Sequence, residues 1–453
     1  MNRYNSYKDS GVEWIGEIPS SWNLISIKHL VSTKITDGPH ETPTWVDEGI
    51  PFLSVESVQN NKLYFEKKRG YITKELHEEY SKKCKPQRDD IFIVKSGSTT
   101  GKSTIVETDE EFNIWSPLCI VRPDKKKVLP KFIFSSIQSF YFRRFVELGW
   151  SFGTQPNIGM GVIENIKLVI PSLLSEQQQI VSFLDDKTQK IDSLILQKEK
   201  KIELLKEKRT SLINHVVTKG IDSNVEMKDS GVEWIGEIPS DWIMSKFKFD
   251  TLNPVQYGIN ISSDKYVDEG IRFVRITDIN EDGSLKPNNG RYLISEDVPE
   301  EFLLNKYDVL FCRSGHTVGK SYLHTSEGVF TSGGYLVRFN FRNYFESKFI
   351  FYLSKTHFYW DWIKLNTVVS TIENVNGDKY QNFIYPKPPL NEQQQIVEYL
   401  DKQTEEIDTL IQLEQKKIDT LKEYRQSLIS EVVTGKIRVC KEDNSLSLNS
   451  QTV

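Results

Sequence analysis

Two segments of the sequence occur twice, 216–220 residues apart. Residues 8–22 (KDSGVEWIGEIPSSW) return at 228–242 with 14 of 15 positions identical. Residues 175–220 return at 391–436 with 26 of 46 positions identical. The stretches between these segments differ far more. The chain is therefore predicted to fold as two similar halves with a shared frame, which suits the recognition of two different targets with one geometry.

Each half is predicted to contain a mixed domain followed by a long helix. Short apolar runs such as 91–94, 118–121, 309–311 and 335–339, bounded by Gly, Pro, Asn and Asp, are typical of strands. Apolar helical stretches at 131–148 and 347–365 make the class α+β. The long helices are expected to begin near Pro171 and Pro388, with Ser175 and Asn391 as N-caps. The predicted order is a domain at 1–171, a helix at 172–220, a domain at 221–387, a helix at 388–440 and a flexible tail at 441–453.

The two inserts are distantly related. Residues 46–50 match 267–271, and residues 90–103 (DIFIVKSGSTTGKS) match 308–321 (DVLFCRSGHTVGKS). We therefore expect the two domains to share a fold while their surfaces have diverged.

Bulk properties exclude several classes of protein. No apolar run of about 18 residues is present, so no membrane span is expected. The four cysteines are scattered, which fits a reducing cytoplasm, and no cysteine or histidine spacing suggests a metal site. The net charge of -5 does not indicate nucleic-acid binding, although residues 61–88 hold nine Lys and Arg against four Glu. From this run alone we favour a solvated face over a phosphate-contacting surface.

Both long helices carry a 3.5-residue apolar repeat, from 184 to 216 and from 400 to 432, which predicts a coiled coil. The repeat spans about 33 residues, or about 50 Å at 1.5 Å per residue. A parallel pairing of the two copies places Arg209 opposite Arg425. An antiparallel pairing instead matches Lys198 with Glu414, Thr188 with Arg425, and Arg209 with Thr404.

Pairing of either helix with a copy of itself sets Lys198 against Lys198 or Glu414 against Glu414. Such like charges disfavour self-association. We therefore predict an intramolecular antiparallel pair with the two domains related by a pseudo-twofold axis. Readers of double-stranded DNA often bind half-sites about 34 Å apart, and a rigid spacer of this length suits that task.

The segment SGSTTGKS at 96–103 is similar to a phosphate-binding loop, but only three residues separate its glycines where four are required. The second copy has the same short spacing, so we infer no ATPase. What remains is a glycine-rich turn after a strand. It fits a DNA phosphate or a base edge as well as it fits a structural hairpin turn. No nucleophile, base or cofactor motif stands out, so the chain is predicted to be non-catalytic.

Two further loops differ between the halves. Residues 36–43 (TDGPHETP) correspond to 256–261, and residues 151–159 (SFGTQPNIG) correspond to 370–377. Asn, Gln, Thr and His read base edges, and they are also ordinary turn residues. Taken singly, each loop is explained by turn formation.

Taken together and in order, these motifs resemble the specificity subunits of Type I restriction–modification systems. The matching features are the GxIPxxW segment, the DGPHxTP loop, the SGSTTGK and SGHTVGK turns, the TQPNI loop and the PxLxEQQQIVxxLD start of the long helix. They cover nearly the whole chain, although the second half lacks a clear DGPHxTP loop and a TQPN sequence. The resemblance implies two target recognition domains joined by two antiparallel helices, each domain reading one half of a bipartite, asymmetric DNA site.

The resemblance also implies partners. Two methyltransferase subunits that bind S-adenosylmethionine would methylate adenine N6, and two restriction subunits would use ATP and Mg. The chain itself would hold no cofactor. Base flipping for methylation would take place in the partner. A scaffold that binds no DNA and a P-loop-like NTPase are the competing hypotheses, and salt-dependent retardation of duplex DNA and a nucleotide-binding assay distinguish them.

The residues expected to contact DNA lie mainly in the loops and turns named above. In the first half they are Thr36, His40, Thr42, Lys67, Lys68, Arg69, Lys95, Ser96, Ser98, Thr99, Lys102, Gln155 and Asn157. In the second half they are Tyr257, Asn260, Arg275, Arg313, Ser314, His316, Thr317, Lys320, Asn374 and Asn376.

Overall fold

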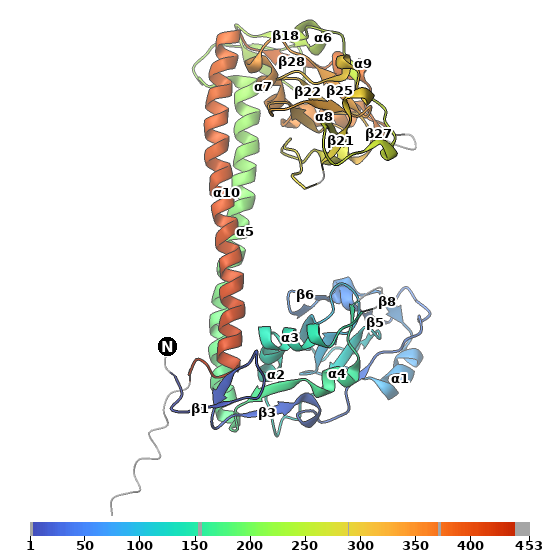
Figure 1. Ribbon diagram of the computed structural model, residues 1–453, viewed down its shortest axis with the longest axis vertical. Coiled ribbons are helices and arrows are strands. Elements are labelled where there is room, and N and C mark those ends of the chain that lie inside the picture. Colours follow the sequence, from blue (N-terminus) through green and yellow to red (C-terminus); the bar gives the residue numbers. More distant parts are fainter. Residues whose placement is uncertain (1–2, 153–155, 289, 370–372, 440–453) are drawn as a thin grey trace, which may run out of the picture. The chain divides into compact units, whose positions relative to one another are not determined.

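The computed structural model describes residues 3–152, 156–288, 290–369 and 373–439. The chain forms two compact units (Figure 1). Unit 1 comprises residues 1–198 and 416–453, and unit 2 comprises residues 199–415. Each long helix therefore contributes one part to each unit.

Unit 1 contains a four-stranded sheet of order β10-β9-β12-β4, a three-stranded sheet of order β11-β5-β8, and four two-stranded pairs. The strands are β1 (Tyr7–Asp9), β2 (Glu17–Pro19), β3 (Asn23–Ser26), β4 (Thr36–Asp37), β5 (Ile50–Leu53), β6 (Val58–Gln59), β7 (Lys62–Leu63), β8 (Gly70–Ile72), β9 (Ile91–Val94), β10 (Ser103–Ile105), β11 (Asn113–Ile114), β12 (Leu118–Val121), β13 (Ser151–Phe152), β14 (Pro156–Asn157) and β15 (Lys167–Ile170).

Unit 2 repeats this arrangement, with sheets of order β23-β22-β25-β19 and β24-β20-β21. Its strands are β16 (Met227–Asp229), β17 (Glu237–Pro239), β18 (Ile243–Lys246), β19 (Gln256–Tyr257), β20 (Ile271–Val274), β21 (Arg291–Leu293), β22 (Val309–Cys312), β23 (Ser321–Leu323), β24 (Phe330–Ser332), β25 (Leu336–Phe339), β26 (Val368–Val369), β27 (Glu373–Asn374) and β28 (Ile384–Lys387). In both units the pairing is antiparallel except for β11 with β5 and β24 with β20. The duplication seen in the sequence thus extends to the sheets, and the predicted class of two similar mixed domains with long helices is confirmed.

The central strand β9 consists entirely of buried apolar residues because both faces of its sheet are covered. Ile91 and Ile93 belong to the core that includes helix residues such as Phe132. Phe92 and Val94 point to the opposite face and pack in a separate cluster with Leu53. The same alternation between two cores occurs along β22 in unit 2.

The predicted helical stretches at 131–148 and 347–365 are each two helices, which corrects the sequence-based expectation. Unit 1 has α2 (Pro130–Ile137) and α3 (Phe140–Leu148), and unit 2 has α7 (Tyr344–Leu353) and α8 (His357–Asn366). The breaks occur at N-caps: the Ser139 hydroxyl accepts from Phe142 N at 3.2 Å, and the Thr356 hydroxyl accepts from Tyr359 N at 3.4 Å. Such caps satisfy a free N–H at a helix start. The shorter helices are α1 (Lys74–Lys83), α4 (Met160–Asn165), α6 (Phe247–Asp250) and α9 (Gly377–Gln381).

The long helices are α5 (Leu174–Lys219) and α10 (Leu390–Val433). Their first turns include Ser175 and Asn391, so the prediction that these two residues are N-caps was wrong. The first helical hydrogen bonds instead go to the carbonyls of Leu173 and Pro389, from Gln177 N at 3.2 Å and Gln393 N at 2.9 Å. Each long helix therefore begins one residue before the predicted N-cap, at Leu174 and at Leu390.

The repeated EQQQ sequence joins each long helix to the opening segment of its half. Glu176 Oε1 accepts from Trp22 Nε1 at 3.1 Å, and Glu392 Oε2 accepts from Trp242 Nε1 at 2.8 Å. Both tryptophans are fully buried. A buried indole N–H is costly without an acceptor, so the glutamate and the tryptophan are needed together in each half.

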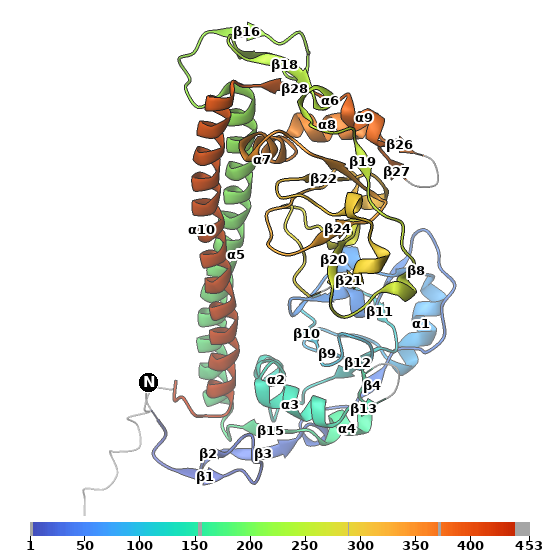
Figure 2. The same cartoon turned by 45° about the horizontal axis from the view of Figure 1, so that its top comes forward.

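Helices α5 and α10 pack side by side in both views (Figure 1, Figure 2). Every seam position predicted from the 3.5-residue repeat is buried or half-buried. In unit 2, Lys201 Nζ lies 3.0 Å from Glu414 Oε1 and Arg209 Nε lies 3.1 Å from Asp408 Oδ1. The residue numbers of the contacting positions on α10 decrease as those on α5 increase, so the two helices run antiparallel.

Polar seam residues also bond within their own helices. The hydroxyls of Thr188 and Thr404 donate to Leu184 O at 2.7 Å and Leu400 O at 2.6 Å. In unit 1, Arg425 Nε donates to Asp192 Oδ1 at 2.8 Å, one turn beyond Thr188. Each seam arginine therefore meets a carboxylate at the margin of the apolar stripe.

Candidate nucleic-acid interface

In unit 1 the segment 96–102 is the hairpin turn between β9 and β10. Gly101 N donates to Val94 O at 2.9 Å, and Lys102 N donates to Thr99 O at 3.0 Å. Gly97 and Gly101 have φ of 93° and 89°, a region that other residues rarely adopt. Internal hydrogen bonds and the two glycines therefore fix the conformation of this hairpin turn. Ser98 and Lys102 are exposed on its surface, and Thr99 is half-buried.

The loop after α3 is fastened to this turn. Ser96 and Asn157 form a backbone bridge, and Ile158 N donates to Lys95 O at 2.8 Å. The Thr100 hydroxyl also donates to Pro156 O at 3.1 Å. The structure therefore brings together two predicted site segments that lie some 60 residues apart in the sequence. Gln155 lies outside the described residues.

The third predicted segment, 36–43, is held by a buried carboxylate. Asp37 is 1% exposed, and its oxygens lie 2.7 Å from Lys83 Nζ and 2.5 Å from Lys95 Nζ. Burial alone raises the pKa of Asp37, but the hydrogen bonds from Lys83 and Lys95 outweigh it, so the pKa is lowered. Lys95 therefore serves to fix the loop to the sheet, since its ammonium group is committed to Asp37.

The rest of this loop presents polar side chains to solvent. His40 Nε2 lies 3.2 Å from Asp37 Oδ2, and the His40 side chain is 71% exposed. Thr42 is exposed, whereas Thr36 is half-buried in β4. Gly38 has no room for a side chain, because a Cβ there would lie 1.9 Å from Ile114 O.

Unit 2 builds the corresponding turn with different side chains. The Arg313 guanidinium lies 4.8 Å from the ring centre of Tyr257, and the Tyr257 hydroxyl accepts from Gly377 N at 2.9 Å. Ser314 and Asn374 form the backbone bridge that Ser96 and Asn157 form in unit 1. Arginine stacked on tyrosine thus replaces the lysine–aspartate pair of unit 1.

The tips of the two turns differ most. The exposed His316 occupies the place of Ser98 in unit 1. The Thr317 hydroxyl donates to Ser314 O at 3.1 Å within the turn. Nearby Asn260 is exposed, and Asn376 caps α9 by accepting from Lys379 N at 3.0 Å.

Several residues that the sequence predicted to contact DNA lie apart from these turns and their adjoining loops. Arg69 is paired with Glu56 at 2.5 Å and stacks 4.8 Å over Trp115. Lys68 lies 4.7 Å over Tyr71. The exposed Lys67 ends the 3-10 helix Phe65–Lys67.

In unit 2, the predicted residues Arg275 and Lys320 are both bound to carboxylates. Arg275 is bound to the buried Asp278 at 2.6 Å, and Lys320 Nζ lies 2.6 Å from Glu281 Oε1. The sequence-based reasoning missed Lys83, which lies 46 residues from Asp37, and Glu281. No local pattern links either residue to the side chain it neutralises.

A scan for protein families gives a match to the Type I restriction modification DNA specificity domain over residues 19–204 and 258–423. The chain belongs to this family. Two Methanocaldococcus jannaschii proteins, named for the MjaX and MjaVIII specificity subunits of type I restriction enzymes, are each 24% identical to it. The MjaX match covers 94% of this chain and 96% of that protein, and the MjaVIII match covers 93% and 94%.

A solved structure concerned with assembly and conformational transition of the type I R-M system contains a chain of similar fold. It superposes with a TM-score of 0.70 at 14% identity, over 93% of this chain and 99% of that one. The family assigns this chain as a specificity subunit, which is the non-catalytic subunit of such a system. Among the described residues, no His, Cys, Asp and Glu cluster is suited to a metal ion and no helix is long and apolar enough to cross a membrane.

Proposed function

We propose that this specificity subunit binds a bipartite, asymmetric site in double-stranded DNA, with unit 1 reading one half-site and unit 2 the other. The observation that carries the proposal is the repeated turn that joins β9 to β10 in unit 1 and β22 to β23 in unit 2. Both turns have two glycines of positive φ at matching positions, a hydrogen bond from the second glycine to the end of the preceding strand, and the same bridge to a neighbouring loop. Their exposed tips carry Ser98 in one unit and His316 in the other.

The side chains at these surfaces suit DNA recognition. Hydroxyl, amide and imidazole groups form hydrogen bonds to base edges, and basic groups and backbone N–H groups contact phosphates. The residues we assign to reading are the half-buried Thr99 and those exposed on the turns and adjoining loops: Ser98, His40, Thr42, Asn157, His316, Asn260 and Tyr257. These loops are held in place by three residues that we do not assign to base reading: Lys95, Arg313 and Asp37.

We further propose that the long helices recruit two methyltransferase subunits and, with them, two restriction subunits. Apolar side chains remain exposed on both helices, among them Leu196 at 67%, Leu204 at 52% and Leu413 at 45%. Exposed leucines on a helix that already buries its seam favour a protein partner. In this proposal S-adenosylmethionine binds the methyltransferase, which methylates adenine N6, and ATP and Mg bind the restriction subunit.

The test is a long-read map of adenine methylation in cells that contain the methyltransferase partner, with and without this chain. One split motif should lose methylation when the chain is absent. Exchange of residues 228–386 for those of another specificity subunit should change one half of the motif only. Ser98→Ala and His316→Ala should relax opposite halves, so each variant is the control for the other.

An unchanged methylation map would contradict the proposal and favour a scaffold that binds no DNA. The purified complex with the methyltransferase separates these possibilities directly. A DNA-reading subunit retards duplex carrying the motif, and retardation weakens steeply as salt rises. A scaffold gives no retardation at any salt concentration.

A further inference from the structure

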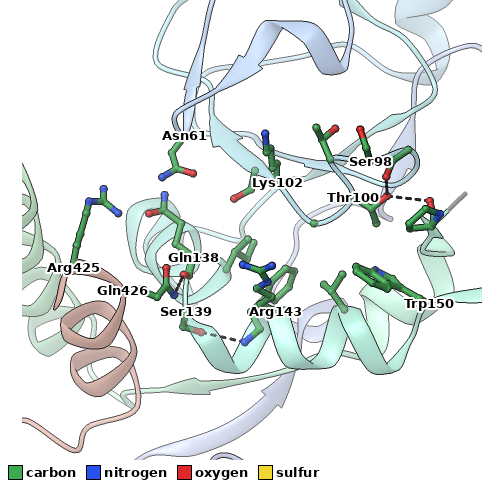
Figure 3. Close-up of a pocket in the computed structure, with 18 residues that line it drawn as sticks. Asn61, Ser98, Thr100, Lys102, Gln138, Ser139, Arg143, Trp150, Arg425 and Gln426 are labelled. Carbon is green, nitrogen blue, oxygen red and sulfur yellow. Dashed lines mark hydrogen bonds between the residues drawn. The ribbon is translucent and has the colours of Figure 1, made fainter. Parts of the chain in front are cut away.

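Unit 1 contains a pocket of about 320 Å³ beside the turn that joins β9 to β10 (Figure 3). The turn forms one wall, the junction of α2 and α3 forms another, and α10 contributes the third. Lys102, Arg143 and Arg425 bring three cationic groups to it, with amides from Asn61 and Gln138. No acidic residue is among the described residues that line it.

The corresponding place in unit 2 carries its own anions. Lys320 takes the position of Lys102 in the repeated turn, and Arg209 takes that of Arg425 in the repeated helix. Lys355 stands just before the N-cap of α8, as Gln138 stands just before the N-cap of α3. Lys320 Nζ lies 2.6 Å from the Glu281 carboxylate.

Asp282 adds a second carboxylate to this cluster in unit 2. Burial by itself raises the pKa of Asp282, but hydrogen bonds from Ser284 and the charges of Lys355 and Arg209 outweigh it, so the pKa is lowered. In unit 2 the loop therefore places Glu281 against Lys320 and Asp282 near Lys355, while Arg209 pairs with Asp408 of α10.

The matching loop of unit 1 lies between β6 and β7 and carries Asn60 and Asn61 in place of carboxylates. Arg143 and Arg425 have carboxylate partners elsewhere, Glu147 at 3.1 Å and Asp192 at 2.8 Å. Within the described part of the chain, Lys102 forms no ion pair, and it is exposed. The pocket of unit 1 thus has a net positive charge that the loop does not neutralise.

We infer that this pocket binds a phosphate of the DNA backbone next to the half-site read by unit 1, and that unit 2 makes no such contact because Glu281 occupies the equivalent place. The inference rests on the proposed function. Lys and Arg side chains with nearby backbone N–H groups are the usual partners of DNA phosphates. A free nucleotide shares the same chemistry, but the glycine spacing of the turn does not match a nucleotide-binding loop.

The experiment uses the full chain in complex with its methyltransferase and a duplex that carries the methylated motif. The dissociation constant is measured by fluorescence anisotropy over a series of salt concentrations. The logarithm of the dissociation constant rises with the logarithm of the salt concentration, and loss of one phosphate contact reduces this slope by about 0.9. Lys102→Ala should show this decrease, and Lys102→Arg should restore the wild-type slope.

Lys125→Ala is the matched control, because Lys125 is an exposed lysine of unit 1 that pairs with Asp89 at 2.6 Å, away from the pocket. Its slope should equal that of the wild type. A Lys102→Ala slope equal to wild type, or an equal decrease in Lys125→Ala, would overturn the assignment. A wild-type complex that retards no DNA would instead refute the proposed function, and this inference with it.

A second measurement distinguishes the two sources of phosphate. Thermal unfolding of the wild-type complex and of Lys102→Ala is followed with ATP and with inorganic phosphate at millimolar concentration. If the pocket binds DNA phosphate, ATP and inorganic phosphate should each change the Tm of the wild type and of Lys102→Ala by the same amount. Stabilisation of the wild type alone by ATP or phosphate would assign the pocket to a free ligand and overturn the DNA contact.

Discussion

Glu414 offers the sharpest test of how the two long helices are held together. It lies in the apolar seam of α10, is 2% exposed, and its carboxylate lies 3.0 Å from Lys201 Nζ on α5. Glu414→Lys places a second positive charge against Lys201 inside this seam. The variant should therefore weaken the pairing of α5 with α10.

The expected magnitude follows from burial. Removing one partner of a buried ion pair costs about 3–5 kcal/mol. The Lys201 side chain is 54% exposed, so solvent screens part of the interaction. We therefore expect Glu414→Lys to lower the free energy of unfolding by about 2–3 kcal/mol. In a unit of this size, each kcal/mol lost lowers Tm by about 2–4 °C.

Thermal unfolding followed by circular dichroism at 222 nm measures the change. Glu414→Leu is the control, since an apolar side chain fits the seam and leaves Lys201 solvated, so its Tm should stay near wild type. The exchange Glu414→Lys with Lys201→Glu should recover much of the loss. Equal Tm values for Glu414→Lys and wild type, or no recovery in the exchanged pair, would refute the proposed role of this ion pair.

Three further predictions concern single sites. Trp242→Phe removes the indole donor to Glu392 and should cost about 1–3 kcal/mol in a denaturant titration. The pKa of Asp37 is lowered from its ordinary value of 3.8, so its stabilising effect is complete above pH 3.8 and is lost as pH falls through the folded-state pKa. Asp37→Asn should therefore show a shallower loss of stability below pH 3.8, measured as unfolding midpoints over a pH series. Gly38→Ala forces a Cβ against Ile114 O and should cost about 1–3 kcal/mol in thermal unfolding, with methylation of one half-site impaired in the map.

Local patterns were enough to predict most of the framework. The apolar runs at 91–94 and 118–121 became β9 and β12 with those same bounds. The 3.5-residue repeat identified the seam, since burial along a helix depends on residues a few positions apart. The internal duplication predicted two similar domains because near-identical segments meet the same neighbours in each half. These features depend on short-range periodicity or on repetition, and a sequence states both directly.

Tertiary structure decided which side chains meet. Asp37 finds Lys83 and Lys95, and Arg313 finds Tyr257, only because folding places separate strands and loops together. The breaks at Ser139 and Thr356 were also invisible to periodicity, because a hydroxyl residue within an apolar stretch becomes a cap only when packing turns the chain there. Whether a lysine of the repeated turn is neutralised or available depends on a loop many residues away. A sequence lists the charges of a surface, but their balance is set by distances across the fold, which no local pattern encodes.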